Sequence, residues 1–316
     1  MLVEDLHIVL KVAEFQSITG AATSLDIRTA TASAALKRVE KALGAELFIR
    51  TTRRLRLSGA GERYLPKCQD ALRLLEQARL NIHEEGDVLE GELRLSVSSD
   101  LGRNLITPWL DDFMDSHPGL RLRLHLSDST IDFYRDPIDV AIRYGSPGEA
   151  NLYGFKLCDS PALLCASKDY IAKHGAPRHP NELHAHNGLF YQLHDLTHNH
   201  WVFQQGGAEY KIRMNSNRIS NDGDQVRRWC IAGKGLAVKS SIEVTEDLLC
   251  GKLVSLMPGY YHSPVELWLI VPSRQSITPV IRVLRDHLID KCNNTLNKLQ
   301  EKGIIKYPAR SPDQMS

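Results

Sequence analysis

The sequence predicts a mixed α/β chain in which a basic, mainly helical amino-terminal segment precedes a larger part of alternating strands and helices. Over roughly the first ninety residues, apolar side chains recur three and four positions apart, as on amphipathic helices. From about residue 92 onward, stretches that alternate apolar and polar residues, as strands do, are separated by helical stretches. The chain has 316 residues, of which 42% are hydrophobic and 24% charged, so two or three domains are expected.

Charge is distributed unevenly along this nearly neutral chain. Residues 28–67 hold ten basic side chains and three acidic ones, which favours contact with phosphate backbones, although a solvated surface would show the same pattern. No apolar run approaches a membrane span, and the start lacks the basic and apolar regions of a secretory signal. The six cysteines include no Cys-x-x-Cys pair. We therefore expect a cytoplasmic protein with no membrane partner and no structural zinc.

Three short helices are predicted at the amino terminus. Ser17 and Thr19 can cap the second helix, and the turn at residues 26–28 precedes the third. Alanines on the second helix permit the close approach of a helix-turn-helix corner. The residues expected to face the core are Leu6, Val9, Leu10 and Ala13 on the first helix, Ala21, Ala22 and Leu25 on the second, and Ala32, Leu36, Val39 and Leu43 on the third.

The third helix and the ribbon after it are expected to contact DNA. The outer face of the helix offers hydroxyls, methyl groups and one lysine, which suit base edges and thymine methyls in the major groove, although a small solvated helix is the alternative. Residues 47–50 and Leu55–Leu57 read as a two-stranded ribbon with arginines at its tip, able to reach a minor groove. This order is typical of a winged helix-turn-helix. The expected DNA-binding residues are Arg28, Thr29, Thr31, Ser33, Lys37, Arg38, Arg50, Thr52, Arg53 and Arg54.

A long linker helix is predicted from about residue 60 to 85, with Ser58 as its cap and residues 86–91 as the linker beyond it. Pro66 either lies in the first turn or kinks the helix. The seam can pack on its own chain or pair with a second copy. Its residues are Leu65, Cys68, Leu72, Leu75, Arg79 and Ile82.

Beyond residue 91 the pattern predicts a parallel sheet with helices between its strands. The expected strands are 92–97, 120–126, 139–143, 162–166, 236–238 and 266–271. The expected helices begin near residue 98 and cover 170–177, 225–232 and 280–289.

Several stretches resemble the LysR-type transcriptional regulators. Residues 15–22 are similar to that family's "GSFTxAA", residues 32–40 to its recognition helix "VSRxIxxLE", and residues 43–54 to "LGxxLFxRTxR". The chain departs from the family at residues 28–30, where Arg-Thr-Ala replaces the commoner Ser-Gln-Pro, and at Ala34, where arginine is usual. These departures obscure the preferred DNA site but leave the architecture intact.

The carboxy-terminal part resembles the family's effector domain at residues 139–145 ("DVAIRxG"), 166–177 ("ASxxYxxxHGxP") and 233–238 ("GxGLAx"). The resemblance implies a type 2 periplasmic-binding-protein fold, in which two α/β subdomains enclose a cleft. It also implies binding to double-stranded DNA, self-association as a dimer or tetramer, and RNA polymerase as a further candidate partner. The expected domains are 1–59 for the winged helix-turn-helix, 60–91 for the dimerisation helix and hinge, 92–292 for the effector domain with subdomains 92–161 plus 267–290 and 162–266, and 293–316 for a tail.

The cleft is the expected ligand site, because strand ends and helix amino termini converge there. The candidate effector-binding residues are Ser98, Ser99, Asp100, Arg143, Asn221 and Asp222. Ser98 and Ser99 offer hydroxyls to a carboxylate, and the start of the helix offers free N–H groups. The negative charge of Asp100 opposes an anion there, and Asp100 can instead cap the helix. Arg143 can clamp a carboxylate or pair with Asp139 or another acid in the hinge. The last two can reach the cleft or act as turn and cap residues.

Two sensing chemistries compete with a small organic effector. The histidines His184, His186, His194, His198 and His200 cluster in the sequence, but residues 195–199 read as a loop and no metal motif fixes a geometry. Cys158, Cys165, Cys230 and Cys250 could sense oxidants, although Cys165 lies in an apolar strand.

The sequence contains no nucleophile elbow, phosphate-binding loop or dinucleotide motif, so neither an enzyme nor a cofactor is expected. The prediction is a sequence-specific transcriptional regulator modulated by a small molecule. The alternative is a regulator of the same architecture that acts constitutively or senses redox state or metal.

Overall fold

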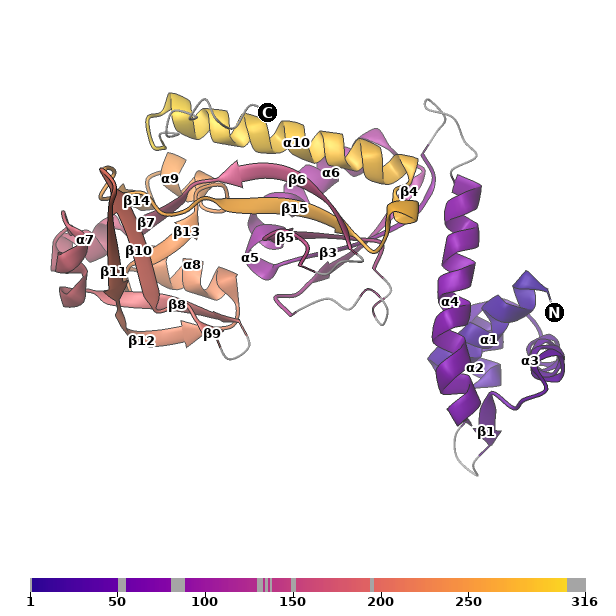
Figure 1. The fold of residues 1–316 in the computed structure, drawn as a ribbon. Helices are drawn as coiled ribbons and strands as arrows, with labels where there is room; N and C mark the ends of the chain where they lie inside the picture. The colour runs from indigo at the N-terminus through magenta and orange to yellow at the C-terminus, as the bar shows by residue number, and fades with distance from the viewer. Residues whose placement is uncertain are drawn as a thin grey trace. The chain divides into compact units, whose positions relative to one another are not determined.

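The structure, a computed structural model, describes residues 2–50, 55–80, 89–129, 133, 136, 138–148, 152–193 and 196–305. The chain forms an amino-terminal and a carboxy-terminal compact unit, which divide near residue 86 (Figure 1). Among the described residues, no helix combines the length and the apolar character needed to cross a membrane.

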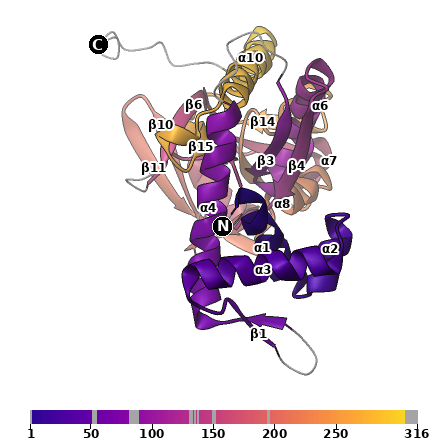
Figure 2. The same cartoon turned by 90° about the vertical axis from the view of Figure 1, so that its right-hand side faces the viewer.

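The amino-terminal unit is a winged helix-turn-helix (Figure 2), as predicted. The Gly20 N–H donates to Ser17 Oγ at 3.1 Å, which confirms Ser17 as the cap of the second helix, and Gly44 ends the third with φ 64°. Apolar residues of the helices and the ribbon share one core: Val9, Val12, Ala21, Leu36, Val39, Leu47, Phe48 and Leu65. The elements are α1 (Val3–Phe15), α2 (Ile18–Ser24), α3 (Thr29–Leu43), the antiparallel strands β1 (Phe48–Arg50) and β2 (Leu55–Leu57), and α4 (Gly59–Leu80).

Helix α4 is the predicted long helix. The Gly61 N–H donates to Ser58 Oγ at 3.0 Å, so Ser58 caps it. Pro66 lies inside the helix, not in its first turn, and removes one backbone hydrogen bond there. The first three seam residues are buried, whereas Leu75 is 56% exposed. The remainder of the predicted helix, residues 81–85, and most of the linker lie outside the described residues.

A five-stranded sheet of order β4-β3-β5-β15-β6 forms the first subdomain of the carboxy-terminal unit. Strands β3, β4 and β5 are parallel, but β15 runs antiparallel to both of its neighbours, so the expectation of an all-parallel sheet is wrong. An apolar alternation predicts a strand but not its direction, and β15 returns from the second subdomain. The strands are β3 (Gly91–Val97), β4 (Leu120–Leu126), β5 (Val140–Tyr144), β6 (Tyr153–Ser160) and β15 (Val265–Val271).

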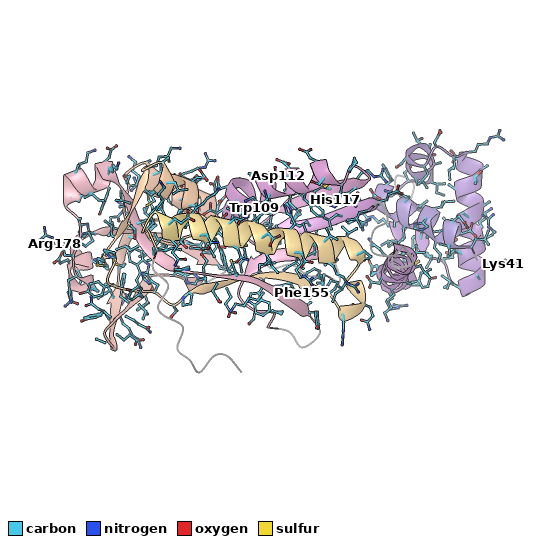
Figure 3. All side chains as sticks on the ribbon, turned by 90° about the horizontal axis from the view of Figure 1, so that it is seen from above. Lys41, Trp109, Asp112, His117, Phe155 and Arg178 are labelled. Carbon is cyan, nitrogen blue, oxygen red and sulfur yellow. The ribbon has the colours of Figure 1, made fainter. Side chains whose placement is uncertain are left out.

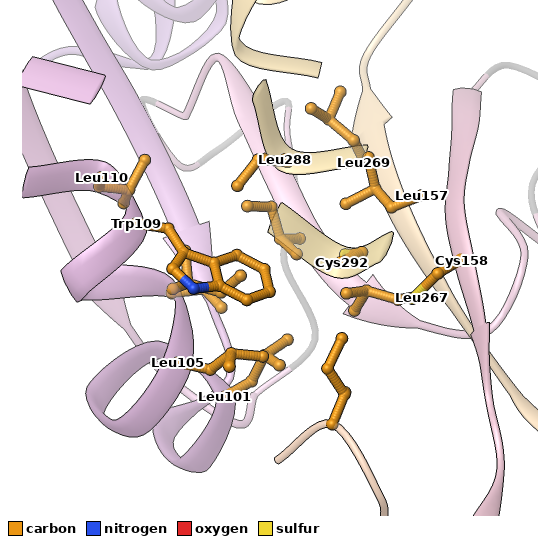
Figure 4. Packing of buried hydrophobic residues seen from close by; sticks show 14 of the residues in the cluster. Leu101, Leu105, Trp109, Leu110, Leu157, Cys158, Leu267, Leu269, Leu288 and Cys292 are labelled. Atoms are coloured by element: carbon orange, nitrogen blue, oxygen red, sulfur yellow. The ribbon is translucent and has the colours of Figure 1, made fainter. Parts of the chain in front are cut away.

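Helices α6 (Thr107–Ser116) and α10 (Pro279–Glu301) pack side by side on this sheet. His287 Nε2 lies 2.9 Å from the Trp109 carbonyl oxygen, and Lys291 pairs with Asp112. Trp109 and Asp112 are labelled on α6, next to α10, in Figure 3. Trp109 meets α10 residues Leu288 and Cys292 above Leu267 of β15 in one apolar cluster (Figure 4).

The helix predicted to begin near residue 98 contains a π-helical turn. It starts as α5 (Ser99–Leu101), widens over Gly102–Ile106 and continues as α6. The Thr107 hydroxyl donates to the Gly102 carbonyl at 2.7 Å within this turn. A side chain at Gly102 would meet Leu126 at 2.5 Å, so only glycine permits this close approach to the sheet.

The second subdomain contains several small sheets. The sheet of order β13-β7-β14 is antiparallel, whereas β12 pairs parallel with β8. The sequence predicted β7, β13, α7 and α8 but not β8 or the β10–β11 hairpin. The elements are β7 (Ala162–Ser167), α7 (Lys168–His174), a 3-10 helix (Pro180–Ala185), β8 (Asn187–Leu193), β9 (Leu196–Thr197), β10 (His200–Gln205), β11 (Ala208–Arg213), β12 (Asn215–Ser220), α8 (Gly223–Ile231), β13 (Ala237–Ser240), α9 (Thr245–Leu249) and β14 (Leu253–Leu256).

Helix α10 extends well beyond residue 289, where the pattern predicted its end. Cys292, Leu296 and Leu299 on this extension are buried, as is Ile305 after it. The expectation of a separate tail from residue 293 is therefore wrong for residues 293–305, because buried residues continue three and four positions apart along the helix. Residues 306–316 lie outside the described part.

His262 gives the second subdomain an expected sensitivity to acid. Burial against Phe203, at a ring distance of 4.2 Å, lowers the pKa of His262 to about 4. The unfolded chain takes up this proton below pH 6.5 and the folded chain does not, so stability should fall as the pH drops below 6.5. The loss between pH 6.5 and 5 should be about 2 kcal/mol. His262→Leu should flatten this slope in urea titrations, whereas His200→Gln, at an exposed position, should leave it unchanged. An equal slope in His262→Leu would refute this origin.

Candidate nucleic-acid interface and effector cleft

The outer face of α3 presents the predicted residues to solvent. Thr29, Thr31 and Lys37 are exposed and Ser33 is half-buried, while Leu36 on the other side is buried. Arg28 occupies the amino-terminal cap position in an extended conformation without a side-chain cap bond. The helix therefore offers a surface of hydroxyls and cations that is free of core contacts.

Arg38 has a partner that the sequence did not reveal. Its Nη2 and Nε donate to Asp5 Oδ1 and Oδ2 at 2.5 and 3.1 Å. The hydrogen bond from Arg38 lowers the pKa of Asp5, which is almost fully buried. This bidentate pair ties α1 to α3 and fixes the orientation of the exposed helix.

The ribbon is tied to α3 by Glu40. Its Oε1 accepts the Leu47 N–H at 2.8 Å and the Phe48 N–H at 3.4 Å. The predicted residues at the tip, Thr52, Arg53 and Arg54, lie outside the described residues, as does the side chain of Arg50.

In the cleft, Asp128 occupies the place proposed for an anion. Its Oδ1 accepts the Ser99 N–H at 2.6 Å, and its Oδ2 accepts the Ser99 hydroxyl at 2.7 Å and the Gly223 N–H at 3.0 Å. The expectation of free donors at Ser99 is therefore wrong, because a carboxylate of the chain itself satisfies them. Since Gly223 belongs to the second subdomain, Asp128 also links the two subdomains.

Asp222 has both of the roles that the sequence allowed: it caps a helix and it contacts the other subdomain. It caps α8 by accepting the Asp224 and Gln225 N–H groups at 2.9 and 3.2 Å, and its Oδ1 lies 3.0 Å from Ser99 Oγ in the other subdomain, where it shares the single hydroxyl proton with Asp128. Asn221 is exposed and Ser98 makes no side-chain cap bond, so the structure does not bring these two residues into the same network.

Asp100 is a buried ion-pair partner and not a helix cap. Lys239 of β13 donates to Asp100 and, at 3.1 Å, to Glu243. Burial raises the pKa of Glu243 to about 7 although Lys239 opposes this. Burial disfavours charge on Lys239, but Glu243 and Asp100 together raise its pKa above the usual value. Lys239 could not be recognised from sequence, because a single lysine in a short strand has no spacing pattern.

The π-helical turn directs polar side chains toward α8. Asn104 Nδ2 donates to Asp100 Oδ1 at 2.8 Å and to Asp224 Oδ1 at 2.9 Å, while its Oδ1 accepts from Arg227 at 3.0 Å. Arg103 pairs with Asp222 at 3.3 Å. The widened turn therefore carries a second set of links between the subdomains.

Arg143 is incompletely paired at the end of β5. Its Nη2 lies 3.4 Å from the Ser127 carbonyl and 3.5 Å from Ser96 Oγ, both long for hydrogen bonds, and its buried Nε has no partner among the described residues. Burial lowers the pKa of Arg143. The Asp139 carboxylate accepts the Arg94 N–H at 2.9 Å, and the acid whose charge raises the pKa of Arg143 against burial is Asp128.

The histidines and cysteines considered as metal or redox sensors have the following surroundings in the structure. Among the described residues, no three His, Cys, Asp or Glu side chains gather as a metal site; His186 instead contacts the Tyr170 hydroxyl, and His194 is not described. Its hydrogen bond with the Cys230 side chain and its burial raise the pKa of Cys165 well above its usual value. Such a thiol reacts slowly with oxidants. Cys250 is exposed and free.

Comparisons with known proteins agree with this geometry. Residues 3–62 match the family "Bacterial regulatory helix-turn-helix protein, lysR family", and residues 86–293 match "LysR substrate binding domain". The chain is 30% identical over 287 residues to the HTH-type transcriptional regulator DmlR of Escherichia coli, covering 91% of this chain and 93% of that protein.

Solved structures of full-length regulators share the fold. CrgA of Neisseria meningitidis, a LysR-type transcriptional regulator, has a TM-score of 0.59 and 27% identity, with 91% of this chain and 98% of that chain covered. The Vibrio cholerae virulence activator AphB has a TM-score of 0.56 and 25% identity, with 92% and 99% covered. The chain combines a DNA-binding helix-turn-helix with an effector-binding domain and therefore belongs to the LysR family of transcriptional regulators, which are not enzymes.

Proposed function

We propose that this protein regulates transcription from specific promoters under the control of a small carboxylate bound in its cleft. The incompletely paired guanidinium of Arg143 is the observation that carries the ligand class. A buried charge without full hydrogen bonding is costly, and a carboxylate would supply a bidentate partner. In the cell, such a regulator acts in the cytoplasm, where the chromosome lies.

On DNA, we assign base-edge contacts to Thr29, Ser33 and Lys37, because they share the solvent-exposed face of α3. Arg28 and Thr31 lie at the start of this helix, within reach of flanking phosphates. Asp5 binds the Nε and Nη2 atoms of Arg38. Arg38 can therefore offer only the remaining part of its guanidinium group to DNA. The ribbon residues Arg50, Thr52, Arg53 and Arg54 would contact the minor groove and the phosphates beside it.

Self-association is part of the proposal. The exposed Leu75 continues the buried line of Leu65, Cys68 and Leu72 on α4, as expected of a helix that pairs with a second copy. A dimer would place two α3 helices on the half-sites of a pseudo-palindrome. We retain 1–59, 60–91 and 92–292 as the proposed domain limits, with the last extended to residue 305, and RNA polymerase as a candidate partner at the promoter.

The ligand would act by population shift. Ser99, Asp100, Asp128 and Asp222 join the two subdomains in the arrangement described, so a ligand that binds another arrangement more tightly must compete with these contacts. A change in the angle between subdomains would then alter the spacing of the paired DNA-binding units.

The first experiment is enrichment of sheared genomic DNA on the purified protein at two salt concentrations. Discrete promoter fragments that persist at the higher salt are expected. Uniform enrichment that disappears with salt would contradict sequence-specific binding.

A panel of small mono- and dicarboxylates, screened by thermal unfolding, tests the ligand class. A carboxylate present at 100 times its Kd should stabilise the protein by about 2.7 kcal/mol. Arg143→Met should abolish this gain, and Arg121→Met, on the exposed part of β4, should keep it. If no carboxylate stabilises the protein while promoter binding is intact, the alternative of constitutive, redox or metal control gains support.

A further inference from the structure

A second cavity, of about 290 Å³, lies in the second subdomain. It shares no lining residue with the network around Asp128 and Lys239 in the cleft. Its polar lining comes from α7, β8, β12 and the turn after α8: Tyr170, His174, Asn187, Asn217, Arg218 and Lys234.

The inner wall of this cavity is rigid. Tyr170 is only 3% exposed, its hydroxyl accepts the Asn187 N–H at 3.1 Å, and His174 stacks on its ring at 4.6 Å. Asn187 Nδ2 in turn donates to the Lys234 carbonyl at 2.7 Å. A side chain at Gly235 would meet the Asn187 carbonyl at 2.5 Å, so this close packing requires glycine. The cavity is therefore preformed.

The rim of the cavity is cationic. Arg218 donates to Asn217 Oδ1 at 2.7 Å through one nitrogen, and within the described part of the chain neither Arg218 nor Lys234 has a carboxylate within 4.0 Å. None of the lining residues is acidic, and Asp169, which lies beside the lining residue Gly233, forms no ion pair with Arg218 or Lys234 in the described part of the chain. Two cations without counter-ions beside a preformed hollow favour an anion with more than one negative charge.

The carboxyl end of α8 does not cancel this attraction. The carbonyls of Arg228, Trp229 and Cys230 accept the N–H groups of Ala232, Lys234 and Gly233, which reduces the repulsion of an anion by this helix end. The amino end of the same helix holds Gly223, which is bonded to Asp128 in the cleft. One helix of nine residues therefore connects the cavity with the subdomain contacts.

We propose that this cavity binds a small phosphorylated metabolite, with Arg218 and Lys234 on the phosphate and the Tyr170–His174 wall beside the remainder. A phosphate monoester carries close to two charges at neutral pH and presents oxygens that match a guanidinium. A monocarboxylate would leave one cation uncompensated. The volume is near the lower limit of small-molecule sites, which restricts the ligand to a compact molecule.

Calorimetric titration of the full chain with pyrophosphate, without DNA, tests this site. One binding event per chain is expected in the wild type. The double variant Arg218→Ala with Lys234→Ala should weaken it at least tenfold, whereas Arg121→Ala with Lys252→Ala, which removes the same two residue types from exposed positions elsewhere, should not. Arg143→Met should also bind normally, because Arg143 lies in the cleft.

Several results would overturn the proposal: no binding by the wild type, equal binding by the pocket variant, or loss of binding in Arg143→Met. Citrate that competes as strongly as pyrophosphate would overturn the assignment to phosphate. Thermal unfolding of each variant shows that it is folded. Because no DNA is present, failure here leaves the proposed regulation of promoters untouched.

Discussion

Lys37→Ala should lower affinity for an enriched promoter fragment by about 5- to 150-fold, the range for loss of one base-edge contact. Lys37 is exposed on the face of α3 opposite the core, so its removal should not disturb folding. Affinity for unrelated DNA should fall much less, because the lysine contributes only charge there. Fluorescence anisotropy with both DNAs at several salt concentrations measures this difference.

Lys41→Ala is the matched control. Lys41 is exposed in the last turn of α3, four residues after Lys37, so both variants lose the same charge from the same helix. The control should weaken promoter and unrelated DNA nearly equally. Arg54→Ala should likewise act evenly on all sequences and reduce the salt slope by about one. If Lys37→Ala also weakened both DNAs equally, α3 would not read sequence through this residue.

Lys239→Met should reduce the stability of the carboxy-terminal unit by about 3–5 kcal/mol, as expected when one partner of a buried ion pair is removed. The ammonium lies between Asp100 and Glu243, and all three side chains are less than 10% exposed. Without it, two carboxyl groups remain in a site that already raises the pKa of Glu243 to about 7. Urea unfolding followed by tryptophan fluorescence reports this unit alone, because all four tryptophans lie in it.

Adding Glu243→Gln to Lys239→Met should recover part of the loss, because residue 243 then neither carries a buried charge nor has to take up a proton on folding. Lys211→Met is the control: its side chain is 70% exposed and pairs with Glu209 at the surface, where ion pairs contribute about 0–1 kcal/mol. A loss below about 1 kcal/mol in Lys239→Met would show that water or movement of the subdomains compensates the two carboxylates.

The amino-terminal unit could be predicted from sequence because its signals are local. Ser17 and Gly44 mark helix ends, and the apolar period of α3 separates its buried face from its exposed face. The direction of β15 could not be predicted, because it depends on where the chain re-enters the sheet. The polar alternation of the β10–β11 hairpin likewise carried no signal strong enough to be recognised.

The residues of the candidate effector site show the same difference between local signals, which can be recognised in the sequence, and contacts between distant segments, which cannot. Asp222 was recognised as a cap because the sequence places it directly before a helix. Asp128 and Lys239 were missed, since their roles arise only when distant segments meet: Lys239 is 139 residues from Asp100. Arg143 stays a predicted ligand contact, and the acid whose charge acts on it is Asp128 rather than Asp139. Long-range charge pairing is not encoded in local spacing.

The burial of Leu296, Leu299 and Ile305 has a consequence for synthesis of the protein. The core of the effector domain is completed only when residues 296–305 have been made, whereas the winged unit precedes this domain in the chain and has a core of its own. Domains generally fold in the order in which they are made. A chain that terminates early would therefore release a DNA-binding unit joined to an unfinished regulatory core. Such a product would compete for promoters without answering to a ligand.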